Sequence, residues 1–245
     1  VIIYNSAYVI NFAGVEMVMA GGYLGMLVLV FFQVNYILAF AFGAAGMFAV
    51  GALFDRIVLH RVLGRAMPGK EIFVALVIAT VGLSFAIKGI ARLFPYTDDV
   101  RRLRPTFPGT PIDLGPVLVP RQDVAIVAIA VMAMLALFLF FQFTFLGKGL
   151  RAASENPRAA ALIGIPVRSM RMLTWGIACA LAAVAGILIG GKLPMSVDMG
   201  SNVVILAFAA AVIGGFTNLA GAVVGGILLG VTQNLAGILI SSEAI

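Results

Sequence analysis

Long apolar runs dominate the chain, separated by short charged or turn-forming stretches. Most of these runs have about the 17–25 residues that a membrane-spanning helix requires. They are Val15–Phe32, Tyr36–Phe54, Ile72–Phe94, Val124–Leu146, Met172–Gly190, the shorter Val203–Phe216, and Leu219–Ile240. The pattern predicts an all-α fold, a polytopic transmembrane helix bundle that forms a single domain over residues 1–245. The proline-rich segment Pro95–Arg121 is expected to be an irregular loop outside the membrane.

The composition supports a membrane protein. Of the 245 residues, 62% are hydrophobic and 11% are charged, whereas a soluble domain has roughly 45–50% apolar and about 25% charged residues. The net charge is +6, yet the 16 Lys and Arg residues are spread among the loops. That distribution is typical of topology signals in a lipid bilayer and not of a nucleic-acid-binding surface. Because the chain opens inside an apolar stretch at Val1, we expect further residues before it.

Turn-prone breaks interrupt the apolar sequence near both ends, at Asn11–Gly14 and at Gly214–Asn218. Aligning Val9–Gly25 with Ile213–Leu229 gives a faint internal repeat, and we expect its two copies to cross the membrane in the same direction. The identities are Phe12/Phe216, Gly21/Gly225, Gly22/Gly226 and Leu24/Leu228. Glycine-interrupted apolar segments in corresponding positions point to a transport pathway, because broken or re-entrant helices expose backbone polar groups within the membrane.

A short charged island, Glu155–Gly164, lies between two membrane-length runs. Asn156 suits a helix N-cap, Pro157 the first helical position and Gly164 the left-handed residue after a helix. The segment 154–165 therefore predicts a helix of about two turns, too short to span a bilayer that requires ~20 residues. Such a helix at the membrane surface is a feature that a partner protein could bind.

The loop charges give a weak orientation signal. If Asp55–Glu71 and Gly147–Arg171 lie on one side, that side holds nine of the 16 basic residues. Cytoplasmic loops carry the excess of Lys and Arg, so we expect the Glu155 loop to be cytoplasmic.

Two charged side chains fall within or near apolar runs. Glu16 is flanked by apolar sequence on both sides. It therefore either lines a cavity or pairs with another group inside the bundle, or it sits at a helix start in the interface, favoured by the helix dipole. Both interpretations stay open. Lys88 lies six residues from the end of its run, and we expect its long side chain to reach the interface.

The sequence offers no enzymatic constellation. Cys179 and His60 are each the single residue of their kind, so neither a disulfide nor a Cys/His metal site is expected. Asp98-Asp99 has no second acidic cluster with which to hold a divalent cation, and a phosphate-binding Gly-Lys-Ser/Thr motif is absent. We expect no catalytic residues, cofactor or metal.

Three segments together resemble the branched-chain amino-acid type permeases of ABC transporters. Gly149–Ile165, followed by Ala182–Leu188, resembles the cytoplasmic coupling segment and the next helix. Val9–Glu16 with Met19–Tyr23 is similar to the family's Asn-Phe-Ala-His-Gly-Glu pattern, although Gly14-Val15 replaces His-Gly. The version with Asn-Phe-Ala resembles the first of the two permease subunits that these transporters use. Ile213–Gly226 is similar to the C-terminal Gly-rich segment.

The resemblance implies roles for individual residues. A coupling helix that docks into an ATPase subunit would involve Glu155, Ala159, Ala160 and Gly164, with Arg151 and Arg158 as charge partners. The translocation path would include Asn11, Glu16, Gly214, Gly215 and Asn218. The implied partners are two ATP-binding subunits, a second permease subunit and an extracytoplasmic solute-binding protein, with no nucleic acid.

The resulting hypothesis is the multi-pass permease subunit of an ATP-driven importer in the inner (plasma) membrane of a prokaryote. It would move small polar solutes, branched-chain or other hydrophobic amino acids, by alternating access, while partner ATPases hydrolyse ATP. The alternative is a stand-alone channel or secondary carrier for urea, amide or amino-acid solutes. A membrane enzyme is a further rival, but it requires a cluster of polar catalytic groups that the sequence does not contain.

Overall fold

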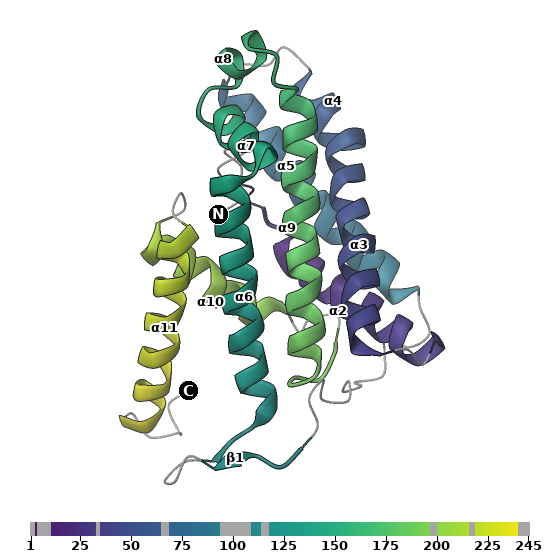
Figure 1. The fold of residues 1–245 in the computed structure, drawn as a ribbon. Coiled ribbons are helices and arrows are strands. Elements are labelled where there is room, and N and C mark those ends of the chain that lie inside the picture. The colour runs from purple at the N-terminus through teal and green to yellow at the C-terminus, as the bar shows by residue number, and fades with distance from the viewer. Residues whose placement is uncertain are drawn as a thin grey trace.

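The computed structural model describes residue 3 and residues 11–32, 35–64, 69–93, 109–113, 118–196, 200–215 and 219–239. These ranges contain helices almost throughout, and five helices are long and apolar enough to cross a membrane. The all-helical bundle predicted from the apolar runs is confirmed. The chain's elements can be followed by colour in Figure 1.

The longer helices reproduce the apolar runs within a few residues. They are α2 (Gly14–Phe32), α3 (Tyr36–Phe54), α5 (Gly69–Arg92), α6 (Arg121–Phe143), α9 (Val167–Gly190), α10 (Gly200–Gly214) and α11 (Leu219–Leu239). Four shorter helical elements connect them: the π-helical turn η1 (Asp55–Leu59), α4 (His60–Leu63), α7 (Phe145–Glu155) and α8 (Pro157–Leu162).

Helix α9 is the centre of the bundle, packed against both α2 and α3. It is the most buried of the five long apolar helices. Its small residues allow this: the Cα of Gly186 faces the Val18 carbonyl of α2, and Gly51 of α3 abuts Cys179 and the Trp175 carbonyl. Close backbone approach through small residues is the usual packing device in lipid, where hydrophobic burial does not drive helices together. The fully buried Cys179 is therefore a packing residue.

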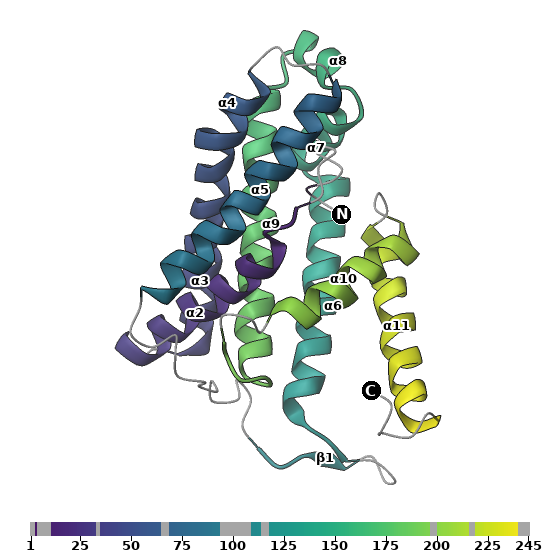
Figure 2. The ribbon, with the colours of Figure 1, turned by 180° about the vertical axis from the view of Figure 1, so that it is seen from behind.

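Helices α10 and α11 form a separate hairpin beside the α2–α3–α9 core. They pack closely where Gly214 meets the Gly221 backbone and Gly225 meets the Ala210 carbonyl. Figure 2 shows that α10 lies obliquely to the long axis of the bundle and that α5 runs beside α2. Both α5 and α10 contact α2, so α2 is enclosed by several elements.

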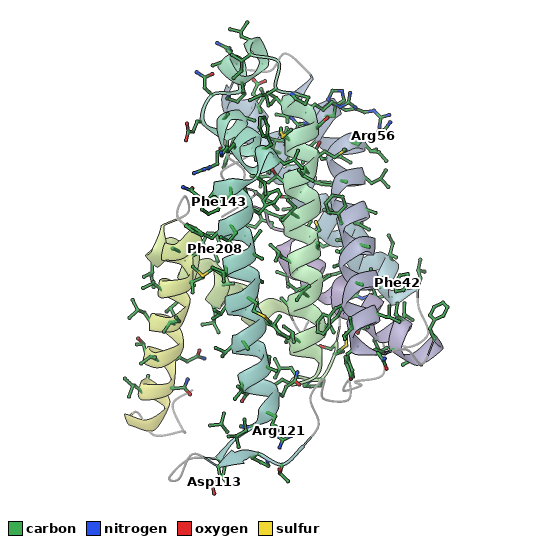
Figure 3. The ribbon with its side chains drawn as sticks, viewed as in Figure 1. Phe42, Arg56, Asp113, Arg121, Phe143 and Phe208 are labelled. Atoms are coloured by element: carbon green, nitrogen blue, oxygen red, sulfur yellow. The ribbon has the colours of Figure 1, made fainter. Side chains whose placement is uncertain are left out.

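The polar ends of the bundle are separated along its length. Helices α4 and α8 lie at one end and strand β1 at the other (Figures 1 and 2). Figure 3 shows Arg56 near the α8 end, Asp113 and Arg121 at the opposite end, and Phe42, Phe143 and Phe208 on the flanks between them. The described parts of Asp55–Glu71 and Gly147–Arg171 thus lie at the same end, as the orientation argument assumed.

Two local features differ from the sequence prediction. The run Val124–Leu146 is not one helix, because α6 ends at Phe143 and the Thr144 side chain caps the new helix α7, its Oγ1 accepting a 2.9 Å hydrogen bond from the Gly147 amide. The loop Pro95–Arg121 contains two short strands, β1 (Ile112–Asp113) and β2 (Leu118–Val119), paired antiparallel with Ile112 opposite Val119.

Candidate functional site

The break before α2 is a capped helix start. The Asn11 side-chain oxygen accepts a 3.0 Å hydrogen bond from the Ala13 amide, and its amide nitrogen lies 3.4 Å from the Met17 sulfur. The helix then begins at Gly14. In both ribbon views this start lies beside the middle of α9 and not at an end of the bundle (Figures 1 and 2). Helix α2 thus begins at mid-height.

Glu16 lies in the first turn of α2 and is only 4% exposed. Its Oε1 is 3.4 Å from the Lys88 ammonium of α5, and its Oε2 is buried without a hydrogen-bond partner in the structure. Glu16 is at a helix start, but this start lies inside the bundle and not in the interface, so the interpretation of a paired group inside the bundle fits the structure. The expectation that Lys88 reaches the interface did not anticipate this ion pair, because its partner is distant in the sequence.

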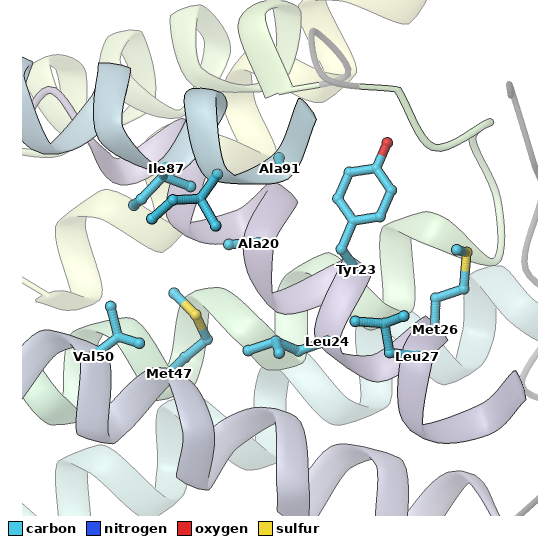
Figure 4. A pocket seen from close by; sticks show the side chains of 10 residues that line it. Ala20, Tyr23, Leu24, Met26, Leu27, Met47, Val50, Ile87 and Ala91 are labelled. Carbon is cyan, nitrogen blue, oxygen red and sulfur yellow. The ribbon is translucent and has the colours of Figure 1, made fainter. Parts of the chain in front are cut away.

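An apolar cavity of about 280 Å³ opens between α2, α3 and α5. Figure 4 shows side chains from all three helices around it. Its lining consists of Ala20, Tyr23, Leu24, Met26 and Leu27 of α2, Met47 and Val50 of α3, and Ile87, Ile90 and Ala91 of α5. The cavity was not predicted from the sequence, since its lining residues look like ordinary packing residues of three separate runs.

The cavity adjoins the Glu16–Lys88 pair. Residues i and i+4 share a helix face, so Glu16 lies one turn from the lining residue Ala20. Lys88 directly follows the lining residue Ile87 and precedes Ala91 by three positions. Two opposite charges and an apolar cavity are therefore neighbours at mid-bundle.

A second buried ion pair joins η1 to α9. The Asp55 carboxylate is fully buried and accepts a 2.6 Å hydrogen bond from the Arg171 side chain. From the sequence, Arg171 was counted only as a loop charge and Asp55 only marked the start of a loop, so the pair was not predicted. A carboxylate at the boundary of an apolar run was the one available signal.

Helix α8 stands at the end of the bundle with well-formed caps. The Asn156 side chain accepts a 3.0 Å hydrogen bond from the Ala159 amide, which confirms the predicted N-cap. Gly164 has φ +85° and, with Ile165, closes the helix by hydrogen bonds of 3.1 and 3.0 Å to the Ala161 and Ala160 carbonyls. This is the left-handed glycine closure known as a Schellman motif.

The predicted coupling residues surround α8 but do not all belong to it. Arg151 and Glu155 lie in the last turns of α7, whereas Arg158, Ala159 and Ala160 lie in α8. All of these except the buried Ala160 are exposed, as is Gly164. Leu162 and Ile163, which are 88% and 75% exposed, were not predicted as site residues. Large apolar side chains at the polar end of the bundle mark a surface suited to a protein partner.

The predicted path residues are only partly brought together. Asn11 and Glu16 lie at the start of α2, whereas Gly214 ends α10 and Gly215, with φ +84°, follows it. Asn218 lies outside the described residues.

The family model described as branched-chain amino acid transport system / permease component matches residues 1–245. A probable branched-chain amino acid transport permease protein LivH of Methanocaldococcus jannaschii is 38% identical over 96 residues, which are 38% of this chain and 29% of that protein. The high-affinity permease protein LivH of Salmonella typhimurium is 29% identical over 250 aligned residues, covering 98% of this chain and 80% of the relative. BraD of Pseudomonas aeruginosa is 28% identical, with coverages of 94% and 77%. No solved structure matches significantly.

Proposed function

Because the chain belongs to the family of branched-chain amino acid transport system permease components, we propose that it imports branched-chain amino acids by alternating access. The chain is a multi-pass membrane protein and a transport subunit, not itself a catalyst. In the proposed mechanism, closure of separate ATP-binding subunits moves α8, and α8 transmits the movement to the spanning helices. ABC permeases of this family act with ATPase and binding-protein partners generally.

The surface around α8 is the observation that carries this proposal. Its apolar tip, Leu162 and Ile163, is exposed at the polar end of the bundle, and Arg151, Glu155 and Arg158 surround it with charge. An apolar centre with a charged rim is the usual composition of a protein interface. The caps at both ends of α8 hold the short helix as a unit, so force applied to it passes into α7 and α9, which it contacts.

The proposed assembly contains two ATP-binding subunits, a second, non-identical permease and an extracytoplasmic solute-binding protein in the prokaryotic plasma membrane. The resemblance of Asn11-Phe12-Ala13 to the first of two permease types supports the heterodimer. The substrate class is inferred from the relatives, which are branched-chain amino acid permeases.

We also propose that the two copies of the internal repeat form the translocation path. The aligned glycines Gly21 and Gly225 make similar contacts: Gly21 abuts the Ala183 backbone of α9, and Gly225 abuts the Ala210 carbonyl of α10. Helices α2 and α11 also both run downward in Figure 1. We assign the breaks before these two helices, including Asn11, Gly214, Gly215 and Asn218, to the translocation path together with Glu16.

Co-purification of the ATPase with substituted chains tests the proposal. Leu162→Glu places a charge at the apolar centre of the α8 surface, whereas Leu118→Glu makes the same change at an exposed site at the opposite end. A residue central to an interface contributes about 2 kcal/mol or more, equivalent to roughly 30-fold in affinity. We expect L162E to lose the ATPase and L118E to retain it. Deletion of Ser154–Gly164 should act like L162E, and retention of the ATPase by either would contradict the coupling role.

If the intact chain purifies alone and transports without ATP, the channel or secondary-carrier alternative is correct instead. Uptake into vesicles with and without internal ATP separates these two functions.

A further inference from the structure

The ion pair at mid-bundle differs from the other two ion pairs described. The Lys88 and Glu16 charges are 3.4 Å apart, compared with 2.6 Å for Arg171–Asp55 and 2.7 Å for Lys192–Asp123. Charge-assisted hydrogen bonds normally measure about 2.7–2.9 Å, so the Glu16–Lys88 contact is loose. A loose pair loses little when each member exchanges its partner for another group of opposite charge.

Glu16 also has an unused acceptor. Its Oε2 is buried and has no hydrogen-bond partner in the structure. A buried polar atom that is left unsatisfied is costly, and an ionisable group inside a membrane protein is by default a functional candidate. The Lys88 ammonium carries three donors. The pair can thus offer an acceptor to a cation and donors to an anion at one place.

The neighbouring cavity has the size and chemistry of an aliphatic side chain. Its lining is apolar apart from Tyr23. A dry apolar cavity of roughly 150 Å³ holds benzene, and a volume of about 280 Å³ therefore leaves room for a four-carbon branch together with the atoms at its base. Ala20 and Ala91, the lining residues next to Glu16 and Lys88, have small side chains that leave this part of the cavity open.

We propose that the Glu16–Lys88 pair and the α2/α3/α5 cavity form the subsite for the transported amino acid. Glu16 accepts from the ligand's ammonium group, Lys88 donates to its carboxylate, and the cavity takes its branched aliphatic side chain. A zwitterion with an apolar side chain is the one occupant that satisfies all three parts. A lipid acyl chain fits the cavity alone and leaves the charges unused. This assignment rests on the proposed function, because it presupposes that the cargo is an amino acid.

Competition binding to the assembled transporter in lipid nanodiscs tests the subsite. Radiolabelled leucine is displaced by leucine, by leucinamide, which lacks the carboxylate, or by 2-hydroxy-4-methylpentanoate, which lacks the ammonium. Lys88→Gln should weaken the binding of leucine but not that of leucinamide, and Glu16→Gln should weaken the binding of leucine but not that of the hydroxy acid. In each variant, the affinity for leucine relative to that for the matching competitor should fall by about tenfold or more, the usual effect of one charged hydrogen bond.

Matched controls separate recognition from general damage. Lys192→Gln removes a charge from an exposed ion pair and should leave both ratios unchanged. Ala91→Leu narrows the cavity and should weaken the binding of free leucine more than that of free alanine. Ala130→Leu, on the exposed face of α6, should not change this preference. If a charge variant fails to assemble with the ATPase, the Ala91→Leu comparison decides the assignment.

Two negative results are distinguishable. Unchanged competitor ratios in both charge variants, or an unchanged leucine preference in Ala91→Leu, would overturn the subsite while leaving the importer intact. Absence of leucine binding by the parent assembly would overturn the proposed substrate and the subsite together. Loss of the ATPase from the α8 variants tests the coupling role of α8 and does not bear on leucine binding or on the subsite.

Discussion

At the scale of single residues, Asp55 and Arg171 show how costly a membrane-protein ion pair is to disrupt. Asp55 is fully buried and the Arg171 side chain is 14% exposed, with 2.6 Å between them. Removing one member leaves the other charge without compensation. Breaking a buried pair costs about 3–5 kcal/mol, so we expect Asp55→Asn to lower the thermal midpoint of the detergent-purified protein well beyond experimental error.

The exposed Lys192–Asp123 pair supplies the comparison. Its side chains are 55% and 34% exposed, and exposed pairs contribute only about 0–1 kcal/mol. Lys192→Gln should therefore leave the midpoint nearly unchanged. The double variant Asp55→Asn/Arg171→Gln should recover part of the loss, because it leaves no buried charge. An Asp55→Asn midpoint equal to that of Lys192→Gln would disprove the structural role of the buried pair.

These residues also show what the sequence could reveal at this scale. The apolar surroundings of Glu16 were visible along the chain, and the N-cap Asn156 was predicted because capping is local. The partners Lys88 and Arg171 could not be predicted, since each pair joins positions far apart in the sequence. A one-dimensional pattern locates an expensive charge but not the group that compensates it.

At the scale of elements, the contact of α2 with α9 depends on Gly186. A methyl group on Gly186 would collide with the Val18 carbonyl and the Gly22 amide, and backbone atoms cannot move aside cheaply. Overpacking typically costs about 1–3 kcal/mol, so Gly186→Ala should lower the thermal midpoint of the purified protein.

Gly82 of α5 provides the matched control for this prediction. A Cβ there meets no atom within 4 Å, and Ala is a better helix former than Gly by roughly 0.8–1.0 kcal/mol. Gly82→Ala should be neutral or stabilising. Equal midpoints for the two variants would show that α2 and α9 do not approach as closely as the structure has them.

The short helix α8 depends on its N-cap. Asn156→Ala removes the acceptor for the Ala159 amide and should destabilise the helix by about 1 kcal/mol. Hydrogen exchange at the Ala159 and Ala160 amides should become faster by roughly fivefold, since 1.4 kcal/mol corresponds to tenfold. Asn156→Asp keeps the acceptor and should exchange like the parent. Equal exchange in Asn156→Ala would rule out the cap as a stabilising contact.

Most elements could be predicted because their signals are local. Run length located the spanning helices, and Asn156, Pro157 and Gly164 located α8. The break at Thr144 was missed because the apolar run continues past it to Leu146, and only the hydroxyl cap marks the new helix. The π-helical turn at Asp55 has no recognisable signature in the sequence.

At the scale of the whole molecule, the neighbours of each helix were beyond the sequence. Small residues such as Ala182 and Gly186 are visible on the run that became α9, but they do not indicate that α2 and α3 would both pack against it. The cavity follows from this arrangement: α2, α3 and α5 supply its walls, and none of the three runs is distinctive alone. Its position beside Glu16 and Lys88 is what gives ordinary packing residues a proposed role in recognition.

The two polar ends of the bundle are expected to lie on opposite sides of the membrane. Exposed Arg56 and Arg158 lie at the α8 end and exposed Asp113 at the other (Figure 3 for Arg56 and Asp113), and the α8 end is expected to be cytoplasmic. A membrane-impermeant maleimide should therefore label Arg56→Cys and Arg158→Cys only in inside-out vesicles, and Asp113→Cys only in intact cells. The native Cys179 is fully buried, so the unsubstituted chain should give no signal and serves as the blank. Labelling of Arg56→Cys and Arg158→Cys from opposite sides would contradict the fold itself. Labelling of both from outside would preserve the fold but invert the molecule, and α8 could then not bind a cytoplasmic ATPase.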